Sequence, residues 1–140
     1  MMATAIPAIA VADTHALIWW ASSAPRRLGR RARKFFEAVD AGHAVLCIPA
    51  IALVELSEAI HRGMVAVNVP FDAFIESLER TPSRYQVVPL TAAIVARSHS
   101  LFAIPERGDR LIAATAAELG HPIVTRDPAI TAVVGLDHVW

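Results

Sequence analysis

The chain has 140 residues, of which 55% are hydrophobic and 19% are charged. This length fits a single domain, residues 1–140, that buries a core without disulfide bonds or a structural metal. The 13 basic and 13 acidic side chains cancel, which excludes the class of proteins that bind nucleic acid through net charge alone. Any contact with nucleic acid must therefore be local.

The predicted elements alternate between strands and helices along the chain. Short apolar runs predict strands at 8–12, 44–49, 85–90 and 122–126. Residues 138–140 are a candidate for a fifth, closing strand. A helix carrying Trp19 and Trp20 follows the first strand, and helical patterns with cap or stop residues cover 29–42, 51–63, 70–80, 91–103, 109–120 and 128–134. This order predicts an α/β fold, a three-layer α/β/α sandwich with a mainly parallel sheet of four to five strands.

The location of the protein is predicted from its cysteine content and its apolar runs. Cys47 is the single cysteine of the sequence, so no disulfide can form within the chain, which suits a reducing compartment. The apolar start lacks the basic residues of a secretory leader and contains Pro7. No apolar stretch reaches the roughly 18 residues of a membrane span. We therefore expect a cytoplasmic protein without a membrane anchor.

Four acidic residues stand out by their positions. Asp13 and Asp127 end predicted strands, Asp109 opens a predicted helix, and Glu55 lies in the first two turns of the helix after the second strand. The carboxyl ends of parallel strands form the ligand crevice of an open sheet, so these side chains are expected to converge there. Each aspartate also fits a simpler role as a helix cap. Glu55 has no capping role and therefore discriminates between the two interpretations.

Converging carboxylates would need a counterion. Two carboxylates about 4 Å apart repel each other by roughly 4 kcal/mol at an effective dielectric constant near 20. A set of carboxylate oxygens without a thiol suits Mg²⁺ or Mn²⁺ better than Zn²⁺. Such a site suits hydrolysis of a phosphodiester, because the metal lowers the pKa of a bound water and neutralises charge on the phosphate.

Four segments of the sequence resemble motifs of the PIN-domain ribonucleases, and specifically of the VapC-type toxins of toxin–antitoxin pairs. They are DTHALIWW at 13–20, LVEL at 53–56, GDRLIAATA at 108–116 and TRDPAI at 125–130. The resemblance covers nearly the whole chain. It implies a PIN-like α/β/α fold, cleavage of RNA by a Mg²⁺- or Mn²⁺-dependent endoribonuclease, neutralisation by a cognate antitoxin, and a homodimer.

The same resemblance implies roles for individual residues. The metal-binding and catalytic acids are Asp13, Glu55, Asp109 and Asp127. Thr14 and Thr125 lie next to two of these acids, where a hydroxyl can bind water or orient a metal ligand. The segment Glu106-Arg107-Gly108 departs from the family, whose members often read DPFD where this chain reads ERGD.

Basic and aromatic residues are candidates for contacts with RNA or a partner. One helix face carries Arg30, Arg33 and Lys34 near its start. The helix dipole favours acidic residues at the start of a helix and basic residues at its end, so this arrangement is the reverse of the favoured one. Contact with RNA phosphates and a solvated helix face are equally good interpretations. Arg110 and Arg126 each adjoin a site acid and are expected to hold the scissile phosphate or to pair with the acids. The resemblance implies that some of Trp19, Trp20, Phe71 and Phe74 serve a dimer interface or an antitoxin groove, and core packing explains the others.

Two alternatives to a ribonuclease remain open. One is a PIN-like module that binds RNA or protein without cutting it, which metal dependence would separate from an enzyme. The other is a phosphatase of the haloacid-dehalogenase kind with Asp13 as nucleophile. That chemistry usually needs an aspartate where this chain has His15, and a catalytic lysine, whereas Lys34 is the only lysine of the sequence.

Overall fold

The centre of the molecule is a five-stranded, wholly parallel sheet in the computed structural model, which describes residues 5–140. Its strands lie in the order β3-β2-β1-β4-β5. Their bounds are β1 (Ile9–Ala12), β2 (Val45–Pro49), β3 (Tyr85–Val88), β4 (Ile123–Val124) and β5 (His138–Val139). The predicted parallel sheet is confirmed, including the closing strand.

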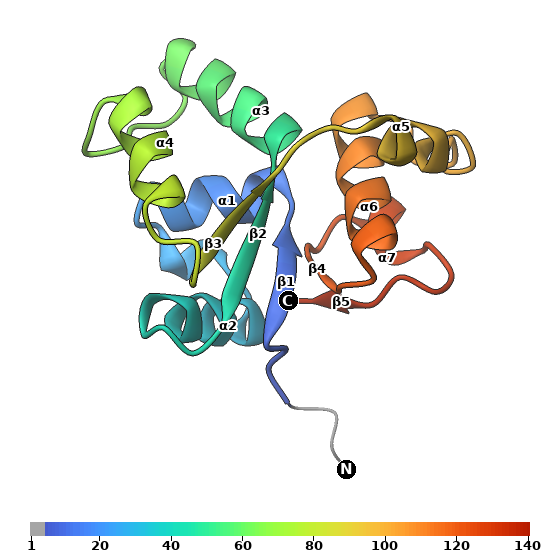
Figure 1. Cartoon of the computed structure of the whole chain (residues 1–140), viewed down its shortest axis with the longest axis horizontal. Coiled ribbons are helices and arrows are strands. Elements are labelled where there is room, and N and C mark those ends of the chain that lie inside the picture. The colour runs from blue at the N-terminus through green and yellow to red at the C-terminus, as the bar shows by residue number, and fades with distance from the viewer. Residues whose placement is uncertain (1–4) are drawn as a thin grey trace.

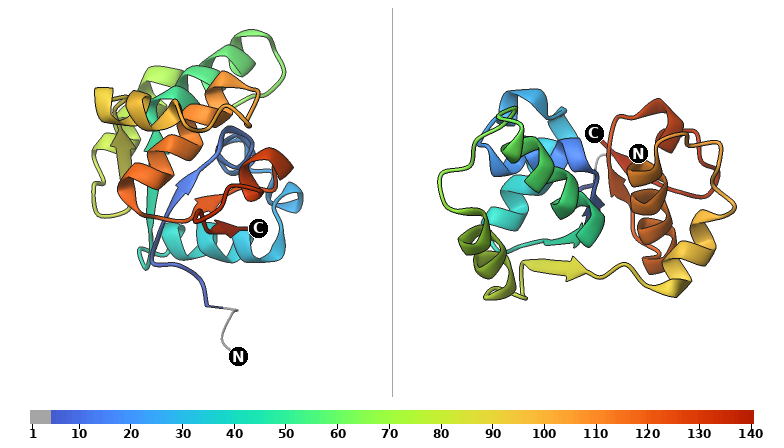
Figure 2. Two further views of the ribbon diagram at one scale, coloured as in Figure 1. Left: turned by 90° about the vertical axis from the view of Figure 1, so that its right-hand side faces the viewer. Right: turned by 90° about the horizontal axis from the view of Figure 1, so that it is seen from above.

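Helices cover both faces of the sheet (Figures 1 and 2). One side carries α1 (Thr14–Ala21), α2 (Arg30–Asp40), α3 (Ala50–His61) and α4 (Phe71–Glu79), with a 3₁₀ turn at Pro25–Arg27. The other side carries α5 (Ala92–Ser98), α6 (Arg107–Leu119) and α7 (Pro128–Thr131). The three-layer α/β/α architecture is therefore confirmed.

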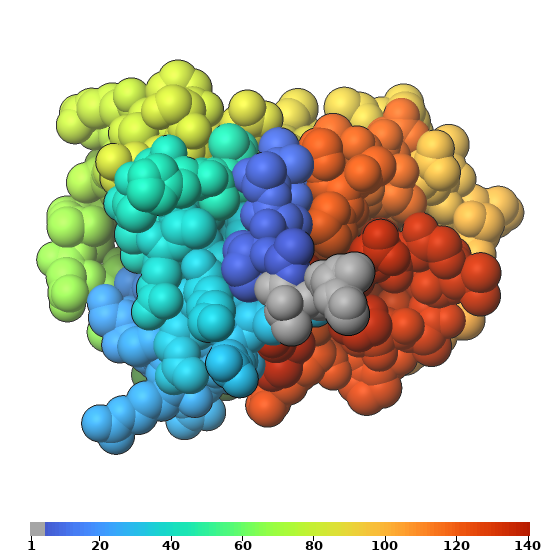
Figure 3. All heavy atoms as spheres, turned by 90° about the horizontal axis from the view of Figure 1, so that it is seen from below, coloured from blue at the N-terminus to red at the C-terminus, as the bar shows by residue number. Residues whose placement is uncertain are grey.

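The connections place a topological switch point between β1 and β4. From β1 the chain proceeds to β2 and β3 on one side, then crosses to β4 and β5 on the other. In Figure 3 the segment around β1, drawn in blue, lies between α2, drawn in cyan, and the C-terminal segments, drawn in orange and red. In open parallel sheets, the crevice at such a switch point is where ligands bind.

Apolar periodicity explains how the helices attach to the sheet. Ala32, Phe35, Phe36 and Val39 form the predicted stripe of α2, and all four are buried. The bulky aromatic residues Trp19, Trp20, Phe71 and Phe74 are partly buried and pack against the core. The largest fully buried side chains include Leu17, Leu46, Ile48, Leu56, Ile112, Ile123 and Ile130.

Three predicted helix boundaries are wrong. The helix expected at 128–134 ends at Thr131. The helix expected at 109–120 begins at Arg107, because Glu106 rather than Asp109 has the extended backbone of an N-cap. The helix expected at 91–103 ends at Ser98. There the hydroxyls of Ser98 and Ser100 donate to the carbonyls of Val95 and Arg97 and compete with the helical hydrogen bonds.

No membrane-spanning helix is expected from the sequence. Among the helices that the structure describes, none is long and apolar enough to cross a bilayer.

Candidate functional site at the switch point

Asp13 and Asp127 lie side by side at the switch point, because each follows one of two neighbouring strands. The backbone N–H of Asp13 donates to the carbonyl of Val124, the last residue of β4, at 3.1 Å. Both aspartates also cap helices: the Ala16 N–H donates to Oδ1 of Asp13 at 2.8 Å, and the Ala129 N–H donates to Oδ1 of Asp127 at 2.9 Å. The capping roles predicted for these two residues are confirmed, and the caps hold both carboxyl groups in fixed positions.

Asp109 comes to the same place from the first turn of α6, so its predicted role as a helix cap is wrong. Burial, a hydrogen bond with the Asp127 carboxyl and the negative charges of Asp127, Glu55 and Asp13 together raise the pKa of Asp109 to about 7. Burial is the largest cause of this rise, and the neighbouring carboxylates add to it. The four predicted acids are therefore close enough for Asp109 to respond to the charges of the other three, and we call them the acidic cluster.

Glu55 reaches the cluster from α3 and contacts two other elements. Its Oε1 accepts a short hydrogen bond from the Thr14 hydroxyl at the start of α1. Its carboxyl group also lies directly over Gly108 of α6, where the Cβ of any other residue would overlap it. Glu55 therefore packs among α1, α3 and α6 rather than extending into solvent.

Thr125 is fully buried between the two aspartates of the switch point. Its hydroxyl accepts a hydrogen bond from the Asp127 N–H at 3.0 Å and donates one to the Asp13 carboxylate. Burial raises the pKa of Asp13, while the bonds from Thr125 and from the Ala16 N–H oppose that rise. Thr125 thus links the two aspartates through one hydroxyl group.

The donor set fits a hard divalent cation, although the side chains do not yet form a closed cage. Within residues 5–140, no three His, Cys, Asp or Glu side chains are grouped tightly enough to hold an ion. Glu55 is turned onto Thr14, and Asp109 is paired with Asp127. Carboxylate oxygens are nevertheless the side-chain ligands that Mg²⁺ and Mn²⁺ prefer.

The predicted arginine contacts divide into two kinds. Arg110 lies at the start of α6 but turns to the preceding loop, where it donates to the carbonyls of Ile104 at 2.8 Å and Pro105 at 3.2 Å and stacks over Phe102. The structure therefore places it in the loop rather than among the acids. Arg126 stays beside the site, with its guanidinium 5.2 Å from the centre of the Trp19 ring.

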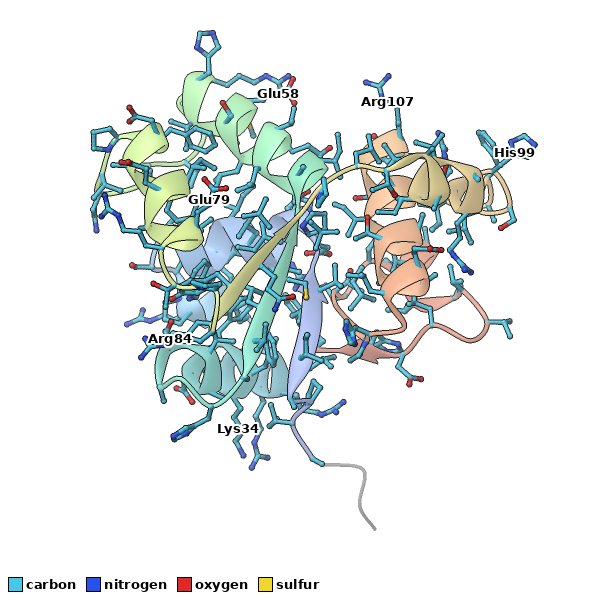
Figure 4. The ribbon with its side chains drawn as sticks, in the orientation of Figure 1. Lys34, Glu58, Glu79, Arg84, His99 and Arg107 are labelled. Carbon is cyan, nitrogen blue, oxygen red and sulfur yellow. The ribbon has the colours of Figure 1, made fainter. Side chains whose placement is uncertain are left out.

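The basic residues on one face of α2 are exposed. Arg30, Arg33 and Lys34 all project into solvent. Figure 4 shows Lys34 pointing away from the end of β1 that carries the acids, whereas Arg107 projects from the start of α6. Arg33 lines a cavity that Trp19 also borders. None of the four acids lines this cavity, so it does not place Arg33 beside them.

Two residues near the site are missed by reasoning from the sequence. Gly108 occupies the first turn of α6, and a glycine inside a helix costs roughly 1 kcal/mol relative to alanine, which is a signal that something packs against it. Trp140 is predicted only as part of a possible closing strand. Its ring lies against Gly29, at the N-cap of α2, a contact that no sequence pattern reveals.

Comparisons with known proteins agree with this geometry. The PIN-domain family profile matches residues 10–136. Ribonuclease VapC22 of Mycobacterium tuberculosis is 30% identical over 115 residues, which cover 82% of this chain and 84% of that protein.

Three solved structures share the fold at lower identity. They are VapBC2 of Rickettsia felis bound to a promoter DNA fragment (TM-score 0.64, 16% identity, 93% of this chain and 96% of that chain), a toxin–antitoxin complex of Klebsiella pneumoniae (0.57, 22%, 91% and 94%) and FitAcB of Neisseria gonorrhoeae (0.59, 17%, 93% and 95%). Their identities are low enough that they bear on the fold alone. The four motifs occur in order, and two of their acids lie at the switch point. The family profile and the relative VapC22 establish that this chain belongs to the PIN-domain family, among its VapC-type members.

Proposed function

We propose that the protein is a metal-dependent endoribonuclease that hydrolyses RNA phosphodiester bonds. The observation that supports this proposal is that Asp109 shares a hydrogen bond with the Asp127 carboxyl and lies within the electrostatic influence of Glu55 and Asp13, which come from other segments of the chain. The naming of its relative VapC22 as a ribonuclease supports the choice of RNA as substrate. A structural cluster of carboxylates that served stability alone would be costly, because it leaves like charges crowded together.

The residues have distinct tasks in this proposal. Asp13, Glu55, Asp109 and Asp127 would hold Mg²⁺ or Mn²⁺, which when bound lowers the pKa of a water molecule and offsets charge on the phosphate. Asp13 and Asp127 are held by their helix caps, and Thr125 fixes their spacing. Thr14 would hold Glu55 in place through the hydrogen bond that its hydroxyl donates to Oε1. Burial and crowding raise the pKa of Asp109 to about 7 in the metal-free protein, and a bound divalent cation would relieve that crowding by offsetting the negative charge of the neighbouring acids.

The proposed partners are a cognate antitoxin and a second copy of the chain. Two of the structural neighbours have names that denote toxin–antitoxin or VapBC assemblies. A cavity of about 480 Å³ lined by Trp19, Trp20, Leu28, Phe36 and Phe74 supports the docking of an apolar antitoxin segment. In a pair of this type the protein would act in the cytoplasm, where its RNA substrate is found.

The test is incubation of the purified protein with an RNA pool, with and without Mn²⁺, followed by mapping of the cut ends. The expected result is a set of defined cuts that require Mn²⁺ and disappear in Asp13→Asn. Asparagine keeps the Oδ1 that caps α1, so this variant should fold normally. Asp72→Asn, an exposed residue in the first turn of α4, is the matched control and should cut like the wild type. Equal cutting by Asp13→Asn would contradict the mechanism, and RNA binding without any cutting would favour a binding module.

A further inference from the structure

A second cavity adjoins the acids and has walls of a different chemistry. It has a volume of about 460 Å³, within the range of about 300–1,000 Å³ typical of small-ligand sites. Its lining includes Asp13, Asp127 and Pro128. The remaining lining residues are aromatic side chains and one arginine, which we call the aromatic wall: His15, Trp19, Trp140 and Arg126. The proposed function uses the acids and leaves this aromatic wall without a role.

The aromatic side chains form a continuous row. The ring centres of His15 and Trp19 are 5.7 Å apart with the planes tilted by 36°, and those of Trp19 and Trp140 are 5.7 Å apart at 62°. The guanidinium of Arg126 lies 5.2 Å from the Trp19 ring centre and 5.6 Å from that of Trp140. A planar ligand entering this cavity would therefore meet two indole rings and a positive charge.

Trp140 is held firmly in this row. Its carbonyl oxygen accepts hydrogen bonds from the N–H groups of Arg31 at 2.8 Å and Ala32 at 3.2 Å, in the first turn of α2. Its indole ring packs directly on Gly29, which has no side chain to displace it. Trp19 is fixed on the other side, because it is partly buried and packs against the core from α1.

Arg126 is the charged member of the aromatic wall. Its side chain is exposed, whereas Trp19 and Trp140 are both partly buried. Its guanidinium lies over the two indole rings, and the residue directly precedes Asp127 in the sequence. The same side chain can therefore stack on a planar group or bind an attached phosphate.

These features match the chemistry of an unpaired nucleotide. Proteins recognise single-stranded RNA by stacking its splayed bases on aromatic rings and on arginine, while base-paired RNA keeps its bases inside the helix. We propose that the cavity formed by His15, Trp19, Trp140 and Arg126 receives the unpaired nucleobase adjacent to the scissile phosphate. This inference rests on the proposed function and assigns these four side chains a role in holding the base beside the cut.

The test compares RNA octamers that differ only in their bases. Labelled homopolymeric octamers are compared with an abasic octamer of the same charge, by fluorescence anisotropy with Mg²⁺ present. The protein carries Asp13→Asn, which keeps the RNA intact. Contacts with phosphates alone would bind both octamers equally, whereas stacking favours the one with bases. We expect the abasic octamer to bind about tenfold more weakly or worse, since stacking of one base contributes a factor of this size.

Variants of the two tryptophans locate the effect. Trp19→Leu should bind both octamers with nearly equal affinity, and Trp19→Phe, which keeps an aromatic face, should recover much of the difference. Trp140→Leu keeps the backbone carbonyl that caps α2 and should reduce the difference as well. Phe102→Leu is the matched control, because Phe102 is an exposed aromatic residue outside this cavity, and it should discriminate as the parent does. Circular dichroism and the melting temperature of each variant report whether it is folded.

The outcomes separate the two proposals. Equal binding of both octamers by the parent protein would overturn the base pocket, whatever the cleavage assay shows. Parallel weakening of both octamers in folded Trp19→Leu would also overturn it, because a purely structural role for the Arg126 stack predicts that result. Base-dependent binding by a wild-type protein that cuts no RNA would support the pocket and contradict the nuclease function.

Discussion

The acidic cluster and the basic run of α2 are the two most strongly charged regions of the molecule, and they are built in opposite ways. Each acid of the cluster is held by a contact: a helix cap for Asp13 and Asp127, the Thr14 hydroxyl for Glu55, and a hydrogen bond with the Asp127 carboxyl for Asp109. Arg30, Arg33 and Lys34 instead extend into solvent. Fixed charges are suited to chemistry, because they are already in place when the substrate arrives. Mobile exposed charges are suited to holding an RNA backbone.

The largest effect is expected where a fixed acid is changed. Asp127→Asn should lower the rate of RNA cleavage by more than about 100-fold, because even residues that only orient metal ligands account for 10–100-fold. Its melting temperature should stay close to that of the wild type, since the asparagine oxygen can still accept the Ala129 N–H. Single-turnover cleavage and thermal melts check the two halves of this prediction. A folded Asp127→Asn protein with wild-type cleavage would remove Asp127 from the site.

The second-largest effect on cleavage is expected at Gly108, which belongs to the segment that departs from the sequence motif of the family. A methyl group at this position would overlap the Glu55 carboxyl, so Gly108→Ala should displace Glu55 and lower the cleavage rate by about 10-fold or more. Its cost in stability should be small, because alanine favours the helix by about 1 kcal/mol over glycine.

A double-mutant cycle isolates this interaction. Glu55→Ala is expected to lower cleavage by itself, and adding Gly108→Ala to it should cause no further loss, since the overlap is gone. Additive losses in the double variant would show that Gly108 acts on the site without Glu55.

These interactions mark the limit of what the sequence could predict. Alternating apolar runs identified every strand, and caps located Asp13 and Asp127, because both signals are local. The course of Arg110 depends on the fold of the loop at 104–105, to which it binds. The contacts of Glu55 with Gly108 and of Trp140 with Gly29 join segments more than fifty residues apart. Such contacts depend on how helices pack, and periodicity within one helix does not specify them.

A smaller effect, on stability rather than chemistry, follows from crowding of the acids. In the folded, metal-free protein the pKa of Asp109 is about 7, compared with an ordinary value of 3.8. The folded state therefore binds more protons than the unfolded state between these values, and its free energy of unfolding should fall as the pH rises from about 4 to 7. Asp109→Asn removes this dependence and should raise the melting temperature at pH 7.5 in EDTA.

Metal binding should reverse that comparison. Mn²⁺ is expected to raise the melting temperature of the wild type at pH 7.5, and to raise that of Asp109→Asn much less, because the variant lacks one of the metal ligands. Thermal melts between pH 4 and 8, with EDTA or with Mn²⁺, measure both effects. A wild-type melting temperature in EDTA that rises steadily from pH 4 to 7 would contradict the crowding of these acids.

The smallest effect on chemistry is expected from the basic run. If Arg30 and Arg33 contact RNA phosphates, Arg30→Gln and Arg33→Gln should weaken binding, and each should reduce the slope of log Kd against log salt by about one for the phosphate that its arginine neutralises. Cleavage at saturating RNA should not change. Lys34→Gln is the internal comparison, because Lys34 points away from the acids in Figure 4 and should change the slope least. Equal slopes in all three variants and the wild type would assign the run to a solvated helix face.

The central claim is that the four carboxylates form a metal-dependent catalytic site, and its most direct test is the rate of cleavage of one mapped RNA as a function of Mn²⁺ concentration. We predict no cleavage by the wild type in EDTA, a rise to saturation with Mn²⁺, and a rate for folded Asp13→Asn that stays more than about 100-fold lower at every concentration. Cleavage that persists in EDTA, or an Asp13→Asn curve that matches the wild type, would contradict the account.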